Sequence, residues 1–365
     1  MLEKGRISSF QLSVLLVGFV LGSSIIITPG GDAGHDAWIA IALGLMEGSL
    51  VALIFTALVL RFKDKTIIEI NDLVFGKVIG KLISVLFLWY FLHLGALVLN
   101  DYVHFFRLEL YPATPRTVML LIIMLVCAST VNRGIEALAR CSLILVPLTI
   151  SVIFLVTMFL IPHFNLNNLM PILDLPIGKL LWSAHSVASF PFAESVVFVM
   201  ILAFLNKSEK GGRAVSKALI IAGLVLIIAS IRNSAVLGPM VAAYNYPSYQ
   251  AVQVIDIRDI FTRLEILVAI NFITMGFLKI SVLLYGTVLG LAQVLNLQSY
   301  RPIILPVGIL MVILALTNVA NTIELFDFTH KIYPIYAVPF QIIIPLITLI
   351  IAKLRQLPKT DGGMP

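Results

Sequence analysis

The feature that most constrains this chain is a series of long apolar runs that follow one another along almost its whole length. A bilayer-crossing helix needs about 20 mostly apolar residues. Only 12% of the 365 residues are charged, so a soluble fold could not hide the apolar side chains of these runs. Open β-sheets are also excluded, because the backbone groups at their edges would lack hydrogen-bond partners in lipid. Ten runs qualify as candidate spans: 10–29, 36–60, 79–106, 117–131, 136–161, 178–205, 214–238, 263–295, 303–320 and 334–352. The sequence therefore predicts an all-α membrane protein with ten transmembrane helices in a single integral domain over 1–365.

The basic residues between the runs predict the orientation of the chain. With residue 1 placed inside, 17 of the 25 Lys and Arg fall in inner segments and 6 in outer segments. Basic residues close to the end of a run are counted with the adjoining segment, and the remaining two, Arg232 and Lys279, lie deeper within runs. Because Lys and Arg concentrate on the cytoplasmic side of membrane proteins, both termini are expected in the cytoplasm, which requires an even number of spans. The loop 206–213 should face inwards and the loop 162–177 outwards.

Ten spans also predict an internal repeat. Two sets of five have opposite orientations, which is the inverted-repeat arrangement of many secondary transporters. The expected repeats cover about 10–161 and 178–352, followed by a cytoplasmic tail at 353–365. In such folds the first helix of each half is interrupted near mid-membrane, so the first and sixth spans should contain breaks.

Both of those spans contain residues that disrupt a helix. In the first, Gly22 has no side chain and can leave helical geometry, and the hydroxyls of Ser23 and Ser24 can satisfy freed backbone groups. In the sixth, Pro191 removes a backbone donor and clashes with the preceding turn. An ordinary kink remains the alternative, since Gly and Pro are frequent in membrane helices. The coincidence of the two positions favours a substrate-binding break in each half.

Lys279, deep in the eighth span, is the strongest single candidate for function. An ammonium at mid-membrane costs about 3 kcal/mol on insertion scales and usually faces a cavity or a partner. It could stand where sodium-coupled transporters of this type hold an ion, between the first and eighth spans; a snorkelling or structural lysine is the alternative. Ser281 and Tyr285 are spaced i, i+4 and share a helix face. With Lys279 they are expected to form a polar strip.

Three further polar residues lie within the runs. Glu194 closes the break in the sixth span, where it could bind a ligand amine, carry a proton or cap the following half-helix. Tyr90 offers an aromatic face and a hydroxyl to a central cavity, with core packing as the alternative. Glu47 is expected to pack against polar groups in the bundle, with a role in carrying a proton as the alternative. No catalytic, phosphate-binding or metal-binding motif is present, so we expect no enzyme activity, no cofactor, no metal and no nucleic-acid partner.

Several stretches resemble a known family of membrane proteins. The segment 22–29, Gly-Ser-Ser-x-x-x-x-Pro, resembles the broken first helix of the amino acid–polyamine–organocation (APC) transporters, and Ser-Phe-Pro-Phe-Ala-Glu at 189–194 resembles their broken sixth helix. Within that superfamily the chain resembles the spore germination permease-like family, the B subunits of germinant receptors in endospore-forming bacteria. This resemblance also rests on segments 165–172, 263–265 and 277–281, and it covers essentially the whole chain.

The resemblance implies a ten-helix, LeuT-like fold with a 5+5 inverted repeat in the spore inner membrane. It implies a complex with a larger A-type membrane subunit and a C-type lipoprotein, and a role in sensing a small germinant, often an amino acid. One departure is Phe192, where transporters often keep Gly; its bulk would shrink the pocket. The resemblance also implies that Phe190 and Leu94 belong to the ligand-binding site. The family's ligand pocket carries over to Gly22, Tyr90, Leu94, Pro191, Ser281 and Tyr285.

The sequence therefore predicts a germinant-receptor subunit that binds a small zwitterionic or polar molecule at the two breaks. Two alternatives stay open. The first is a proton-coupled amino-acid transporter of the APC superfamily, which would use the same pocket. The second is a structural scaffold whose cavity binds nothing.

Overall fold

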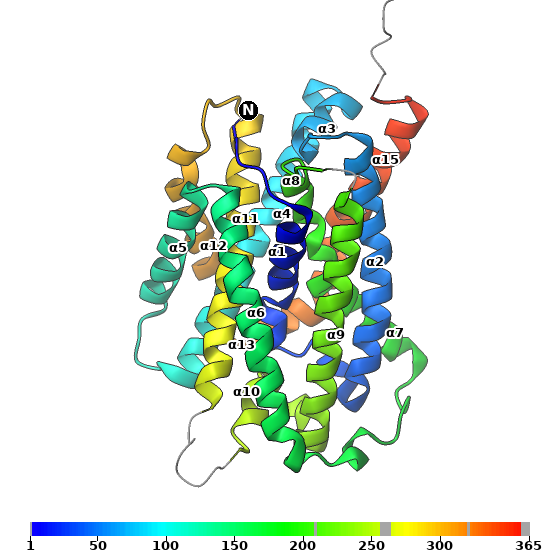
Figure 1. Cartoon of the computed structure of the whole chain (residues 1–365), viewed down its shortest axis with the longest axis vertical. Helices are drawn as coiled ribbons and strands as arrows, with labels where there is room; N and C mark the ends of the chain where they lie inside the picture. The colour runs from blue at the N-terminus through cyan, green and yellow to red at the C-terminus, as the bar shows by residue number, and fades with distance from the viewer. Residues whose placement is uncertain (1, 208–209, 256–263, 320–321, 359–365) are drawn as a thin grey trace, which may run out of the picture.

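The chain forms a bundle of helices (Figure 1). The computed structural model describes residues 2–207, 210–255, 264–319 and 322–358. Within these ranges, the only β-type pairing is an isolated bridge between Ile7 and Leu205. The α-helices are α1 (Ser9–Leu21), α2 (Ala37–Arg61), α3 (Ile67–Phe75), α4 (Lys77–Phe105), α5 (Arg116–Asn132), α6 (Ile135–Leu160), α7 (Ile177–Val187), α8 (Val199–Leu202), α9 (Gly211–Leu237), α10 (Pro247–Val252), α11 (Glu265–Val294), α12 (Ile304–Thr317), α13 (Thr322–Asp327), α14 (Tyr333–Val338) and α15 (Ile344–Leu354).

Many of the helices match the predicted apolar runs. Seven helical segments of the described residues are long and apolar enough to cross a membrane: 31–61, 77–110, 135–163, 177–202, 211–243, 265–294 and 323–354. Three shorter apolar helices cover 9–21, 116–132 and 301–317. Arg263 at the start of the predicted eighth run lies outside the described residues, as do Arg258, Asn321 and Lys359. The chain is therefore a multi-pass membrane protein.

The first helix lies inside the bundle. α1 packs against α6, α9 and α11, and α4 packs along α11. Large apolar side chains on α5, α12 and α15 are instead exposed on the outside of the bundle. In a membrane protein such a surface faces lipid. The broken first helix is thereby shielded by other helices, which brings its interruption close to α4 and α11.

The two described ends of the chain lie at the same end of the bundle. The N-terminal residues and the end of α15 are both at the top of Figure 1. We call residues 2–8 the N-terminal strap. Ile7 donates its N–H to the carbonyl of Phe204 at 3.0 Å and accepts from the N–H of Asn206 at 3.0 Å. These bonds attach the strap to the segment that follows α8.

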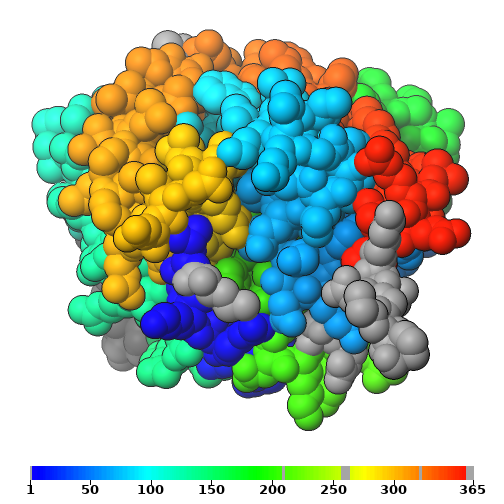
Figure 2. All heavy atoms as spheres, turned by 90° about the horizontal axis from the view of Figure 1, so that it is seen from above, coloured from blue at the N-terminus to red at the C-terminus, as the bar shows by residue number. Residues whose placement is uncertain are grey.

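Side chains of the strap reach other parts of the same end. The carboxylate of Glu3 accepts from the hydroxyl of Tyr300 at 2.9 Å, and burial raises the pKa of Tyr300, which keeps that donor protonated. Arg6 forms an ion pair with Asp64 at 2.9 Å. A cavity of about 580 Å³ lies between the strap, residues 64–72 and residues 289–298. Figure 2 looks onto this face.

Candidate functional site

The first predicted break is present and begins at Gly22. α1 ends at Leu21, and Gly22 has φ −1° and ψ −116°, far from helical values. The short 3₁₀ segment η1 (Ser23–Ile25) follows. A Cβ at Gly22 would lie 2.5 Å from Cδ of Lys279. The missing side chain therefore leaves room for the lysine to pass beside the end of α1.

The exposed carbonyls at this break are satisfied locally. Ser24 Oγ donates to the carbonyl of Val20 at 2.5 Å and approaches that of Leu21 at 3.2 Å. Both carbonyls lost their helical donors when the helix ended. The first break thus supplies its own cap, from a serine three and four residues beyond the two carbonyls.

The second predicted break is present at Phe190. α7 ends at Val187 and continues as a π-helical segment, η6 (Ala188–Phe192), in which Phe190 has an extended conformation with φ −131° and ψ 114°. The 3₁₀ segment η7 (Ala193–Phe198) and the short α8 complete the span. Pro191 has no N–H to continue the helix, so the chain is interrupted where the sequence predicts it.

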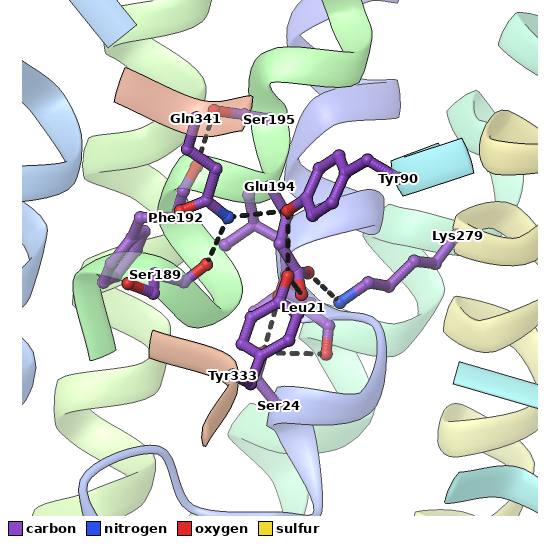
Figure 3. Close-up of polar contacts among 11 residues, drawn as sticks. Leu21, Ser24, Tyr90, Ser189, Phe192, Glu194, Ser195, Lys279, Tyr333 and Gln341 are labelled. Atoms are coloured by element: carbon purple, nitrogen blue, oxygen red, sulfur yellow. Dashed lines mark hydrogen bonds and ion pairs between the residues drawn. The ribbon is translucent and has the colours of Figure 1, made fainter. Parts of the chain in front are cut away.

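A buried ion pair joins the two breaks. Lys279 Nζ lies 2.5 Å from Glu194 Oε2, and the side chains are 0% and 1% exposed. The ammonium also lies over the rings of Phe190 and Phe19, at 4.7 and 5.3 Å from their centroids. These aromatic faces attract a cation. Lys279 reaches from α11 to the carboxylate beyond the second break, as Figure 3 shows.

A chain of hydrogen bonds supports the carboxylate (Figure 3). Tyr333 Oη donates to Glu194 Oε1 at 2.8 Å and lies 2.9 Å from Tyr90 Oη. Gln341 Nε2 donates to Tyr90 Oη at 2.7 Å and to the carbonyl of Ser189 at 2.9 Å. With Tyr333 donating to the carboxylate, Tyr90 must donate to Tyr333. All donors then point towards Glu194, an arrangement that favours a charged carboxylate paired with a charged lysine.

The space beside the ion pair is small. A cavity of about 20 Å³ is lined by Leu94, Asp101, Phe190, Glu194, Tyr333 and three neighbours, which corresponds to about one water molecule. Asp101, on α4, also interacts electrostatically with Lys279 and Ser23. The central site is closed in this conformation, and any amino acid that binds here must first separate its walls.

The structure brings most of the predicted site residues together. Gly22, Phe190, Glu194 and Lys279 meet at the ion pair, and Ser23 lies beside Asp101. Others adjoin it through the hydrogen-bond chain, the cavity or the breaks: Tyr90, Leu94, Pro191 and Ser24. Glu47 does contact a polar group, since its carboxylate lies 2.6 Å from Nδ1 of His185.

Three expectations about the pocket are not met. Phe192 does not narrow the pocket, because its side chain packs against Gly48 of α2, whose missing Cβ leaves the room. Ser281 faces Cys127 of α5, and Tyr285 lies near Glu3 of the strap. Residues two apart on a helix point in nearly opposite directions, so Lys279 and Ser281 cannot form one polar strip.

Four contributors to the site were not predicted. Asp101 and Gln341 are polar residues within long apolar runs, and that signal could have identified them. Tyr333 and the carbonyl of Ser189 gave no such signal, because tyrosine is common near membrane interfaces and a backbone carbonyl is present in every residue. No group of three or more His, Cys, Asp or Glu in the described part of the chain could hold a metal ion.

Comparisons with known proteins identify the family of the chain. The model of the spore germination protein family matches residues 6–323. The chain is 31% identical to spore germination protein KB of Bacillus subtilis (strain 168), over 99% of both chains. The family is one of germination permease-like proteins and not an enzyme family.

Solved structures identify the fold. The structure of MhsT in complex with L-phenylalanine aligns with a TM-score of 0.68 at 13% identity, covering 96% of this chain and 90% of that chain. The nucleobase-cation-symport-1 family transporter Mhp1, closed with bromovinylhydantoin bound, aligns with a TM-score of 0.70 at 11% identity, covering 94% and 78%. The chain has the all-helical LeuT-like transporter fold, and by sequence it belongs to the spore germination protein family.

Proposed function

We propose that this chain is the small-molecule-sensing membrane subunit of a germinant receptor, and that its ligand is an amino acid. The observation that carries the proposal is the buried Lys279–Glu194 pair between the two breaks. The ammonium and carboxylate of a zwitterion match these two groups in charge and could take over their pairing. A buried charge needs a partner at all times, so a zwitterion can separate the pair where a singly charged ligand cannot.

Binding of this kind would act through a two-state equilibrium. The central cavity of about 20 Å³ is too small for an amino acid, so the ligand would favour a conformation in which the broken segments have moved apart. A ligand shifts such an equilibrium only by its difference in affinity for the two states. The closed, ion-paired form would be the resting state. Partner subunits would respond to the form in which the broken segments have moved apart.

The architecture we propose has ten spans as two inverted sets of five. The three shorter apolar helices would also be spans, the first shortened by its break and the other two accommodated by local thinning of the bilayer. The repeats would be 10–161 and 178–352. Both termini would be cytoplasmic, in the spore inner membrane, beside A-type and C-type subunits. Cysteine labelling from outside, in a cysteine-free background, should modify a cysteine placed at Asn167 in intact membranes and one at Asn206 only after permeabilisation.

The test of the ligand class compares matched molecules on the purified protein in nanodiscs. L-amino acids should raise the Tm, whereas the corresponding amines and N-acetylated acids, which each lack one of the two charges, should not. If an amine raises the Tm by as much as the corresponding amino acid does, zwitterion recognition is contradicted. The receptor role itself is tested separately, by loss of the germination response in spores that lack this chain.

Proton-coupled amino-acid transport is the second candidate function, favoured by the transporter fold. Uptake of labelled amino acid into proteoliposomes that stops when the proton gradient collapses would support it. A receptor that only senses should bind the amino acid without accumulating it. A purely structural scaffold should do neither.

A further inference from the structure

A second buried cation lies apart from the ion-paired centre. Arg232, on α9, is only 4% exposed. Its Nε and Nη2 donate to Oδ1 of Asn233 at 3.1 and 2.8 Å, and Nη2 also donates to Ser248 Oγ at 3.0 Å. Nη1 reaches only Thr157 Oγ1, at 3.5 Å. All these acceptors are neutral, and among the described residues no Asp or Glu pairs with Arg232.

A half-buried arginine shows one way in which this chain stabilises such a charge. Arg116 Nη2 donates to the carbonyls of Ala315 and Val319 at 2.7 and 3.1 Å, where α12 ends, and to Oδ1 of Asn100 at 2.6 Å. The last carbonyls of a helix carry a partial negative charge that stabilises a cation. Among the residues that the structure describes, Arg232 donates to no such carbonyl. An unpaired guanidinium inside a membrane domain is costly, so its charge calls for an anion.

The space beside Arg232 fits a very small ligand. A cavity of about 20 Å³ is bounded by Ser248, Asn271 and otherwise apolar residues of α6, α9 and α11, with Arg232 in its wall. That volume holds about one water-sized sphere, which admits a monatomic ion and excludes an amino acid. Its wall also offers a donor: Ser248 Oγ already accepts from Arg232 and from Nδ2 of Asn233, both at 3.0 Å, so its own hydrogen is available.

We propose that this cavity binds one small monovalent anion of about the size of chloride. Arg232 supplies the charge and the Ser248 hydroxyl a hydrogen bond. The site is also coupled to the first break, because Asn233 Nδ2 donates to Thr28 Oγ1 at 3.2 Å, a few residues beyond η1. The anion stabilises the arrangement in which α9, α10 and this segment lie together, and it is a site independent of the germinant pocket.

The experiment measures binding of radioactive chloride to the purified protein in nanodiscs, together with the Tm in chloride and in gluconate at equal ionic strength. We expect saturable binding of one chloride per chain and a higher Tm in chloride. Bromide should substitute, and gluconate, which is far too large for the cavity, should not. Arg232→Gln should lose both the binding and the difference in Tm between the two salts. Arg116→Gln is the matched control: it lowers the Tm in both salts and keeps the difference.

Two further variants keep the test decisive if Arg232→Gln does not accumulate. Arg232→Lys keeps the charge and should retain weakened binding, and Ser248→Ala removes one donor and should weaken binding several-fold. If the wild-type protein binds no chloride, the proposal is overturned and the cavity holds water. The proposal is also overturned if Arg232→Gln or Ser248→Ala binds chloride as tightly as the wild type does.

Discussion

The two helix breaks solve the same problem in different ways. At the first, Ser24 caps the carbonyls of its own helix end, and Gly22 opens the space. At the second, the carbonyl of Ser189 accepts from Gln341, 152 residues further along the chain. The second break also has a local bond, from Ser195 Oγ to the carbonyl of Phe192 at 2.5 Å. The carbonyls of the first break are therefore capped by a neighbouring serine alone, whereas the second break is additionally held by a side chain from a distant helix.

This difference indicates which break can respond to a ligand. A local cap moves together with its own segment, so its geometry depends little on the positions of neighbouring helices. The second break shares Glu194 with Lys279 and Tyr333, so its position depends on whether those contacts are intact. We expect the second break to be the conformational switch and the first to be the fixed wall against which it closes.

Removing one member of the central ion pair should have the largest effect. Lys279→Met leaves Glu194 buried without its cation, and loss of one partner of a buried pair costs about 3–5 kcal/mol. The free energy of unfolding should fall by about that amount, measured by chemical denaturation in detergent, and the germinant response should be abolished. Lys279→Met combined with Glu194→Gln should recover part of the stability but not the response. Single variants that match wild type in both measurements would show that the pair does not hold the breaks together.

The long-range support of the second break should have the next largest effect. Gln341→Leu leaves the buried carbonyl of Ser189 without a donor, which costs about 1–3 kcal/mol. The same denaturation measurement should detect it, and the germinant dose–response midpoint should move as well, because the switch itself is affected. Gln253→Leu, at an exposed glutamine, is the control and should change neither. If Gln341→Leu leaves both values unchanged, the second break is no less local than the first.

Gly22→Ala tests the contact between the first break and Lys279. The added Cβ would lie 2.5 Å from Cδ of the lysine, so the lysine must shift away from Glu194. A loss of about 1.4 kcal/mol at the pair would move the germination midpoint about tenfold, with the protein still present in membranes by immunoblot. Gly31→Ala is the matched control, since nothing lies within 4 Å of its Cβ position. A midpoint that stays in place would mean that the lysine passes Gly22 without depending on it.

Ser24→Ala should have the smallest effect. It removes a local cap, whose net contribution is about 0.5–1.5 kcal/mol, and should lower the stability without moving the germination midpoint. Ser142→Ala, which removes a similar bond to a helix carbonyl elsewhere (2.8 Å), should behave the same way. A shifted midpoint in Ser24→Ala alone would make the first break part of the switch and remove the contrast drawn here.

The same contrast explains how much the sequence could predict. The apolar runs and the breaks at Gly22 and Pro191 depend on neighbouring residues, and they were predicted. The partners of Glu194 are 85 and 139 residues away, and no local pattern links them. The direction of a side chain was also beyond reach: Phe192 and Tyr285 lie on the expected helices but point elsewhere, because neighbouring helices decide which face is the centre.

The N-terminal strap has a consequence for how the molecule is assembled. Its partners at Asn206 and Tyr300 leave the ribosome long after residues 3–7. Arg6 can pair with Asp64 early, but the strap completes its contacts only after most of the bundle has entered the membrane. Its docking is then among the last steps of biogenesis, and protection of the strap from a protease would mark the moment at which the subunit is complete.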